Sequence, residues 1–197
     1  MRGLAHGPGG EAGADLAAEI DARAVLLCDD SGGDPFDEAC SAPWWRLAET
    51  YPAAAVEPAC FSATVELRSN NHVDADDADR DARALFRFLV RRGVVAGEPG
   101  ALPRLLCEGT PLVAMQQIKA EAEGLIVYRA RLGDTVRAGE ILGEIVPPIG
   151  EPTAVVAQTD GVFFARHDQR YAWKGKVIGK IAGAEALPER TGDLLTP

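Results

Sequence analysis

The sequence has few of the residues that build disulfide frameworks, metal clusters or basic binding faces. Its four cysteines follow no CxxC or other regular spacing, which excludes a zinc ribbon and a disulfide scaffold and predicts reduced thiols in a cytoplasmic protein. Only 20 Lys and Arg stand against 30 Asp and Glu, and the net charge of -10 argues against nucleic acid and anionic membranes as partners. No apolar run approaches the roughly 18 residues that span a membrane, and no signal-peptide core follows Met1.

A chain of 197 residues with 47% hydrophobic content is globular and long enough for one large or two small domains. Its first half predicts part of an α/β sheet: a helix over 15–20, a buried strand over 24–28 and a helix beginning near Ser41. A longer helix follows, opened by aspartates and closed by Arg91 and a glycine. We expect the apolar stripes of these last two helices to face the core; they are Trp44, Leu47, Ala48 and Tyr51, then Ala82, Leu85, Phe86, Leu89 and Val90.

An apolar run over 61–67 predicts a β-strand that carries one carboxylate, Glu66, and is followed by Arg68. Because an unpaired buried carboxylate is strongly penalised, a glutamate at the exit of such a strand is more easily explained by chemistry than by folding. The alternative is that Glu66 is an outward-facing residue of a half-exposed strand. The residues alone leave both interpretations open.

A shift to Gly, Pro and Ala over 97–103 indicates a domain boundary. We therefore predict an α/β region at 1–97, a β domain at 98–185 and a tail at 186–197. The β domain contains an internal repeat, because 122–145 and 159–181 each keep a glycine, a second glycine 14 or 15 residues later, and then Gly-x-Ile. Two such halves are expected to interlock.

The repeat resembles the barrel-sandwich hybrid fold of biotinyl and lipoyl carrier domains. A carrier presents a lysine at the tip of the hairpin between the two halves, because the cofactor swings on an exposed amine. The junction here, residues 146–153, contains no lysine. The carrier function is therefore disfavoured, and the nearby lysines are interpreted as solvated strand or turn residues; they are Lys119, Lys174, Lys176 and Lys180.

Three features together resemble the succinylglutamate desuccinylase/aspartoacylase family of zinc carboxypeptidase-like hydrolases: the loop at 29–39, the Thr-Val-Glu-Leu-Arg element at 64–68, and the appended β repeat. The resemblance implies a partial carboxypeptidase-like α/β region followed by an all-β barrel-sandwich domain. It implies a deacylase that cleaves amide bonds of N-acyl amino acids, with Glu66 activating a zinc-bound water and passing the proton to the leaving amine. Arg68 is implied to hold a substrate carboxylate, and a surface arginine is the open alternative.

The chain lacks the metal-ligand motif that the resemblance implies. The resemblance implies a His-x-x-Glu pair near the N-terminus and a later histidine, but the three histidines present, His6, His72 and His167, do not begin such a motif. We therefore expect zinc in the complete family enzyme and none in this chain alone. The chain is predicted to be the C-terminal part of such an enzyme, catalytically incomplete as it stands through truncation, a misplaced start or a split.

Two other interpretations remain open from the sequence. The first is a non-enzymatic binding or assembly protein built on the barrel-sandwich domain, and the second is a self-sufficient hydrolase with a rearranged metal site. The substrate of a completed enzyme would be a small N-acyl amino acid of undetermined identity. The sequence does not determine the oligomeric state, and a homo-oligomer is among the options.

Overall fold

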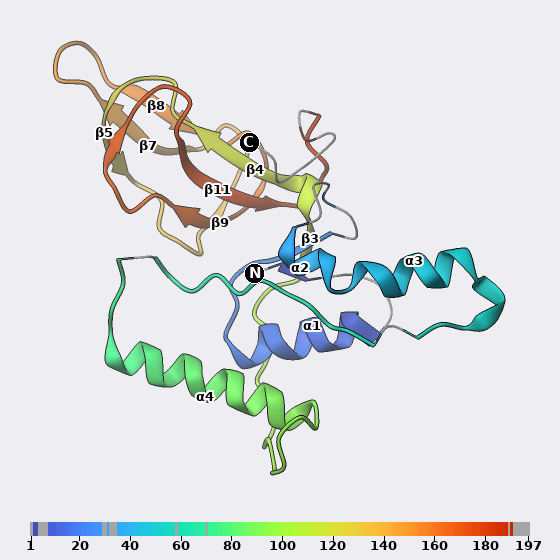
Figure 1. The fold of residues 1–197 in the computed structure, drawn as a ribbon. Coiled ribbons are helices and arrows are strands. Elements are labelled where there is room, and N and C mark those ends of the chain that lie inside the picture. Colours follow the sequence, from blue (N-terminus) through green and yellow to red (C-terminus); the bar gives the residue numbers. More distant parts are fainter. Residues whose placement is uncertain are drawn as a thin grey trace. The chain divides into compact units, whose positions relative to one another are not determined.

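The computed structural model describes residues 2–3, 8–28, 31, 35–57, 59–69, 71–188 and 190 (Figure 1). Residues 29, 30 and 32–34 of the family-like loop lie outside these residues, as does His6. The described residues divide into two compact units, one formed by residues up to Gly109 and the other by residues from Thr110 onward. We call them unit 1 and unit 2. Among the described residues, no helix is both long and apolar enough to cross a membrane.

Unit 1 is a mixed α/β unit with a small sheet, as the sequence predicts at this level. Strand β2 (Val25–Leu27) is central in the order β1-β2-β3 and pairs in parallel with β1 (Arg2–Gly3). The other elements are α1 (Pro8–Glu19), α2 (Phe36–Ala39), α3 (Ala42–Thr50), η1 (Pro52–Ala54) and α4 (Ala75–Arg91); the edge strand β3 (Gly109–Pro111) begins at the last residue of this part of the chain. Its small core joins Ala17, Ala22 and Val25 with Ile20, Leu27 and Cys107.

The division between the units falls at Gly109, downstream of the glycine-rich stretch at 97–103. The reason is the packing of the segment that follows this stretch. Leu105, Cys107 and Gly109 line one cavity together with residues of α1 and β2. Residues 98–109 therefore remain part of unit 1, although they form no helix.

The structure corrects two expectations about unit 1. Residues 61–67 form no strand, because the described sheet consists of β1, β2 and β3 and gives them no neighbour to pair with. The apolar stripes of α3 and α4 are also not core: Leu47, Tyr51 and Phe86 are exposed, and of the expected α4 stripe only Val90 is buried. Unit 1 therefore displays apolar surface that the described chain leaves uncovered.

Unit 2 consists of two four-stranded antiparallel sheets, ordered β10-β5-β7-β8 and β4-β11-β9-β6. Its core includes Phe163, Leu142, Ile145, Ile178 and Ile181, all at most 1% exposed. The elements are η2 (Leu112–Ala114), β4 (Met115–Lys119), β5 (Gly124–Tyr128), β6 (Thr135–Val136), β7 (Ile141–Val146), β8 (Thr153–Val156), β9 (Gly161–Arg166), β10 (Tyr171–Ala172) and β11 (Val177–Gly183).

The predicted interlocking of the two repeats is confirmed by the strand pairings. The first repeat pairs β5 with β7 and the second pairs β9 with β11, both antiparallel. Each repeat also gives one short strand to the other, because β6 pairs with β9 and β10 pairs with β5. The repeated glycines have a steric reason: a Cβ at Gly124 would lie 2.3 Å from the Val146 carbonyl oxygen, and one at Gly161 would lie 2.2 Å from that of Ala182.

The lysines of unit 2 include one that the sequence interpretation places wrongly. Lys176 is buried rather than solvated, with 8% of its surface exposed. Its ammonium donates to the Tyr171 carbonyl oxygen at 2.7 Å and lies 4.4 Å from the centre of the Trp173 ring. The aliphatic stem is covered while the charge keeps two favourable contacts, which is how a lysine tolerates burial.

Candidate functional site

The predicted catalytic residue, Glu66, lies on the irregular segment that leads into α4. Residues 61–65 are half-buried and residues 66–69 are exposed, so the Glu66 carboxylate reaches solvent. Within the described part of the chain this carboxylate makes no hydrogen bond or ion pair. A carboxylate with unoccupied lone pairs is able to accept a proton from water, which is what a general base requires.

The segment that carries Glu66 is held in place at both ends. At its start, the Phe61 and Phe88 rings lie with centroids 6.0 Å apart and an interplanar angle of 59°, a tilted aromatic contact with α4. Phe61 also approaches α1, since a Cβ built on Gly13 would lie 3.8 Å from its ring. At its end, Arg68 binds α4. Glu66 therefore projects from a segment with two anchors rather than from a free loop.

Arg68 is bound to two aspartates of α4. Its Nε lies 3.0 Å from Asp77 Oδ2, and its two Nη groups donate to the two carboxylate oxygens of Asp81. The hydrogen bond to Asp81 is the main reason why the pKa of Arg68 is raised above its ordinary value. The substrate-binding role of Arg68 stays a prediction, and taking up a substrate carboxylate would require the guanidinium to release these partners.

A cluster of charges around Asp77 fixes the first turn of α4. Asp74 caps the helix by accepting a hydrogen bond from the Asp77 backbone N–H at 2.9 Å. The Asp77 carboxylate lies 2.7 Å from His72 Nε2 and also bonds Arg80. The hydrogen bond with His72, followed by that with Arg80, lowers the pKa of Asp77 below its ordinary value. His72 is thus an anchoring partner of the helix.

The described residues do not fit a zinc site. His72 is bonded to Asp77, and the His167 ring, in unit 2, accepts a hydrogen bond from the Gln169 backbone N–H at 3.1 Å. No group of three or more His, Cys, Asp or Glu side chains is placed to hold a metal ion within the part of the chain that the structure describes. A catalytic zinc needs three protein ligands, so these residues support no step that passes through the metal.

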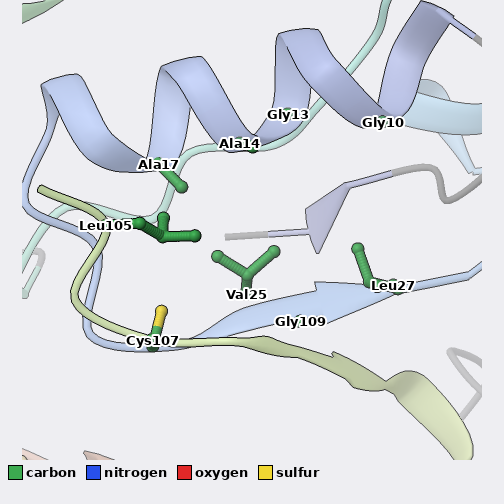
Figure 2. Close-up of a pocket in the computed structure, with 9 residues that line it drawn as sticks. All are labelled: Gly10, Gly13, Ala14, Ala17, Val25, Leu27, Leu105, Cys107 and Gly109. Carbon is green, nitrogen blue, oxygen red and sulfur yellow. The ribbon is translucent and has the colours of Figure 1, made fainter. Parts of the chain in front are cut away.

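A cavity of about 180 Å³ lies between α1 and β2 of unit 1 (Figure 2). Ala17, Val25 and Leu105 line it, and α1 contributes only small residues. Cys107 also lines it, and burial raises the pKa of this thiol, whose Sγ donates to the Ala22 carbonyl oxygen at 3.3 Å. A half-buried thiol with a raised pKa is a poor nucleophile, and the apolar lining offers no converging polar groups. The cavity is therefore a packing defect of unit 1 rather than a reaction site.

The sequence interpretation missed a buried ion-pair cluster in unit 1. Glu19, the last residue of α1, has a fully buried side chain and accepts hydrogen bonds from Arg87 Nε at 2.8 Å and from Arg91 Nη2 at 2.7 Å. These contacts join α1 to α4. The sequence does contain a sign of this ion pair. Ala12, Leu16 and Glu19 share one face of α1, and a glutamate on an apolar face needs a cationic partner when it is buried.

The chain matches solved structures, although no sequence-family model and no curated protein matches it. A protein described as a member of the succinylglutamate desuccinylase/aspartoacylase family from Shewanella amazonensis matches with a TM-score of 0.77 and 25% identity, over 92% of this chain and 50% of that one. A second, from Shewanella frigidimarina, matches with a TM-score of 0.74 and 26% identity, over 92% and 49%.

A third match shows the fold alone. The ectoine utilization protein EutE (DoeB) from Ruegeria pomeroyi, in a product-bound structure, has a TM-score of 0.64 at 16% identity, over 92% of this chain and 52% of its own. The chain spans about half the length of each of these structures. The resemblance predicted from the loop, the Glu66 element and the β repeat is thus confirmed, because 92% of the chain matches the C-terminal half of succinylglutamate desuccinylase/aspartoacylase family proteins.

Proposed function

We propose that this chain is the C-terminal portion of a zinc-dependent hydrolase that cleaves the amide bond of N-acyl amino acids. The match to family proteins at 25% and 26% identity supports this class of activity. The observation that carries the proposal is the exposed, unpaired carboxylate of Glu66 on a segment anchored by Phe61 and Arg68. A general base needs this combination of accessibility and fixed position.

Glu66 is the residue of this chain that takes part in the proposed reaction. It accepts a proton from the attacking water and passes it to the amide nitrogen, so that the C–N bond breaks and a carboxylate and a free amine leave. The zinc ligands would have to come from outside the described residues, which hold no suitable group. Arg68 acts as a positioning residue in this proposal, since its ion pairs with Asp77 and Asp81 hold the end of the Glu66 segment against α4.

The finer fold assignment belongs to the same proposal. We assign unit 1 to part of a zinc carboxypeptidase-like α/β region, supported by its helices and small parallel sheet. We assign unit 2 to the barrel-sandwich hybrid, supported by two interlocked repeats that each give a short strand to the other. The connection between β7 and β8 carries no lysine, and its exposed side chains include Ile149, which supports a structural rather than a cofactor-carrying unit 2.

The proposal is tested by supplying the other half of the fold. This chain is co-expressed with the N-terminal half of the Shewanella amazonensis protein, and hydrolysis of N-succinylglutamate and related N-acyl amino acids is measured with added zinc. The chain alone is expected to be inactive and the assembled complex to be active. Glu66→Gln, nearly isosteric, should lower turnover about 10²- to 10⁴-fold without changing zinc content. Glu98→Gln, an exposed glutamate on the same unit, is the matched control.

The outcomes separate the enzymatic from the non-enzymatic interpretation. Full turnover by the Glu66→Gln complex would remove Glu66 from the site. A complex that assembles and binds zinc but hydrolyses no N-acyl amino acid would favour the alternative of a binding or assembly protein. About one zinc per chain in the isolated protein, with activity lost on chelation, would show that the metal site lies within this chain after all.

A further inference from the structure

Two exposed arginines of unit 2 lie over the same aromatic ring. Arg166 is the last residue of β9 and Arg170 directly precedes β10, and their guanidinium carbons lie 5.4 and 5.0 Å from the centre of the Tyr128 ring. A cation–π contact of this kind engages the flat face of the guanidinium. The N–H donors at the guanidinium edge therefore stay available for another partner. We call these three residues the Tyr128 platform.

Hydrogen bonds to the backbone hold the platform in place. The Tyr128 hydroxyl donates to the Ile178 carbonyl oxygen at 2.6 Å. The same carbonyl oxygen accepts from the His167 N–H at 3.0 Å, and the Arg170 carbonyl oxygen accepts from the Ile126 N–H at 2.7 Å. Both ends of the turn that carries the arginines are therefore tied to neighbouring strands. A ligand that binds both guanidinium groups has to order only their side chains, which lowers the entropic cost of binding.

No carboxylate within the described part of the chain pairs with either guanidinium. The residue opposite Arg166 on β11 is Gly179, which has no side chain, and a Cβ there would lie 2.7 Å from the Phe163 ring. Packing therefore excludes an acidic partner at this position. The acid nearest in sequence, Asp168, binds the backbone of its own turn and lies 3.3 Å from His167 Nδ1. The two positive charges thus reach solvent without a counter-charge from the described residues.

We propose that the Tyr128 platform binds a small oxyanion, a phosphate or a dicarboxylate, through Arg166 and Arg170. This proposal goes beyond the hydrolase function and does not depend on it. Oxyanions match the fork of N–H donors at a guanidinium edge and form charge-assisted hydrogen bonds with it. Because both guanidinium groups lie close to one ring, a single dianion is able to accept from both and offsets their mutual repulsion.

Binding is expected to be weak. Both guanidinium groups are exposed, so water and salt screen their charge, and the net charge of -10 repels anions from the chain at long range. We therefore expect a dissociation constant on the order of 1 mM. Phosphate or a dicarboxylate should bind more tightly than chloride, because chloride lacks the two oxygens that match a guanidinium edge.

NMR titration of the full chain, labelled with nitrogen-15, tests the site. Sodium phosphate and sodium malonate are added separately over about 0.1 to 20 mM, with sodium chloride keeping the ionic strength constant. The Nε–H signals of Arg166 and Arg170 should shift and reach saturation. Saturation with phosphate alone would identify a phosphate ligand, saturation with malonate alone a carboxylate ligand, and each of these results supports the oxyanion site.

Two variants and a matched control connect the binding to the platform. Arg166→Gln and Arg170→Gln should each raise the dissociation constant about 5- to 10-fold, because each removes one charged donor group. Arg137→Gln is the control: Arg137 is also an exposed arginine of unit 2, but it lies over no ring among the described residues. This variant should bind the anion as the wild type does. Unchanged circular dichroism spectra would show that the variants keep the fold.

Two results would overturn the site. The first is a response to phosphate and malonate no larger than the response to chloride at the same ionic strength. The second is saturable binding that the double variant, Arg166→Gln with Arg170→Gln, retains with the wild-type dissociation constant. In either case the two arginines would serve only to cover the Tyr128 ring.

Discussion

Replacing Glu19 by glutamine should weaken the junction between α1 and α4 more than any exposed substitution in unit 1. The Glu19 side chain is fully buried and accepts from Arg87 at 2.8 Å and from Arg91 at 2.7 and 3.1 Å. Glutamine fills the same space but loses the charge and one acceptor oxygen, so at least one arginine loses its partner. Removing one member of a buried ion pair costs about 3 to 5 kcal/mol.

The free-energy cost is smaller for one of the two arginines. The Arg87 side chain is 41% exposed and can recover water when its partner is lost, whereas the Arg91 side chain is only 17% exposed. We therefore expect Glu19→Gln to lower the free energy of unfolding of unit 1 by about 2 to 3 kcal/mol. For a unit of this size, that corresponds to a fall in melting temperature of about 10 °C or more.

Far-ultraviolet circular dichroism during thermal and urea unfolding measures this effect, because the described α-helices all lie in unit 1. Arg91→Ala should cost more than Arg87→Ala, following their exposure. Glu49→Gln, an exposed glutamate on α3, is the control and should stay within about 0.5 kcal/mol of the wild type. A Glu19→Gln chain as stable as this control would refute the argument that the buried carboxylate holds the two helices together.

Two further predictions concern the repeat of unit 2 and the start of α4. Gly124→Ala and Gly161→Ala should each lower the free energy of unfolding, measured in urea, by more than about 2 kcal/mol, because the new Cβ meets a carbonyl oxygen of the backbone. The control is Gly13→Ala in α1, whose Cβ has room beside Phe61. This change should instead raise the free energy of unfolding by about 0.5 to 1 kcal/mol. His72→Ala should raise the pKa of Asp77 toward its ordinary value of 3.8, measured by NMR titration of the carboxyl carbon. Because the pKa of Asp77 is lower in the folded state, its contribution to stability is present above pH 3.8 and is lost as the pH falls through the lower folded pKa. An unaltered Asp77 pKa in the His72→Ala variant would count against the His72 contact.

The features that the sequence predicted are those with local causes. Aspartates at its start and Arg91 at its end define α4, and each acts within one turn of the helix. The repeated glycines of unit 2 likewise reflect a requirement at one position, the close approach of a neighbouring strand. Glu66 breaks an apolar run, but the structure places it in solvent and outside any strand, so the argument from a buried carboxylate does not apply and its catalytic role stays a prediction.

The features that the sequence missed depend on residues far apart in the chain. Glu19 is separated by 68 residues from Arg87 and by 72 from Arg91. The face of α4 that packs inward is set by these contacts and by Arg68, so counting apolar residues selected the opposite face. The strand predicted over 61–67 failed for a related reason, since strand formation needs a neighbour that local composition does not reveal.

The exchange of β6 and β10 makes the two repeats of unit 2 depend on each other for a complete fold. Neither repeat contains all the strands of its own sheet, because β6 completes the edge beside β9 and β10 completes the edge beside β5. A single repeat would therefore be stable only with a second copy that returned the borrowed strand. The connection between β7 and β8 holds the two complementary repeats in one chain, which raises their effective concentration for each other.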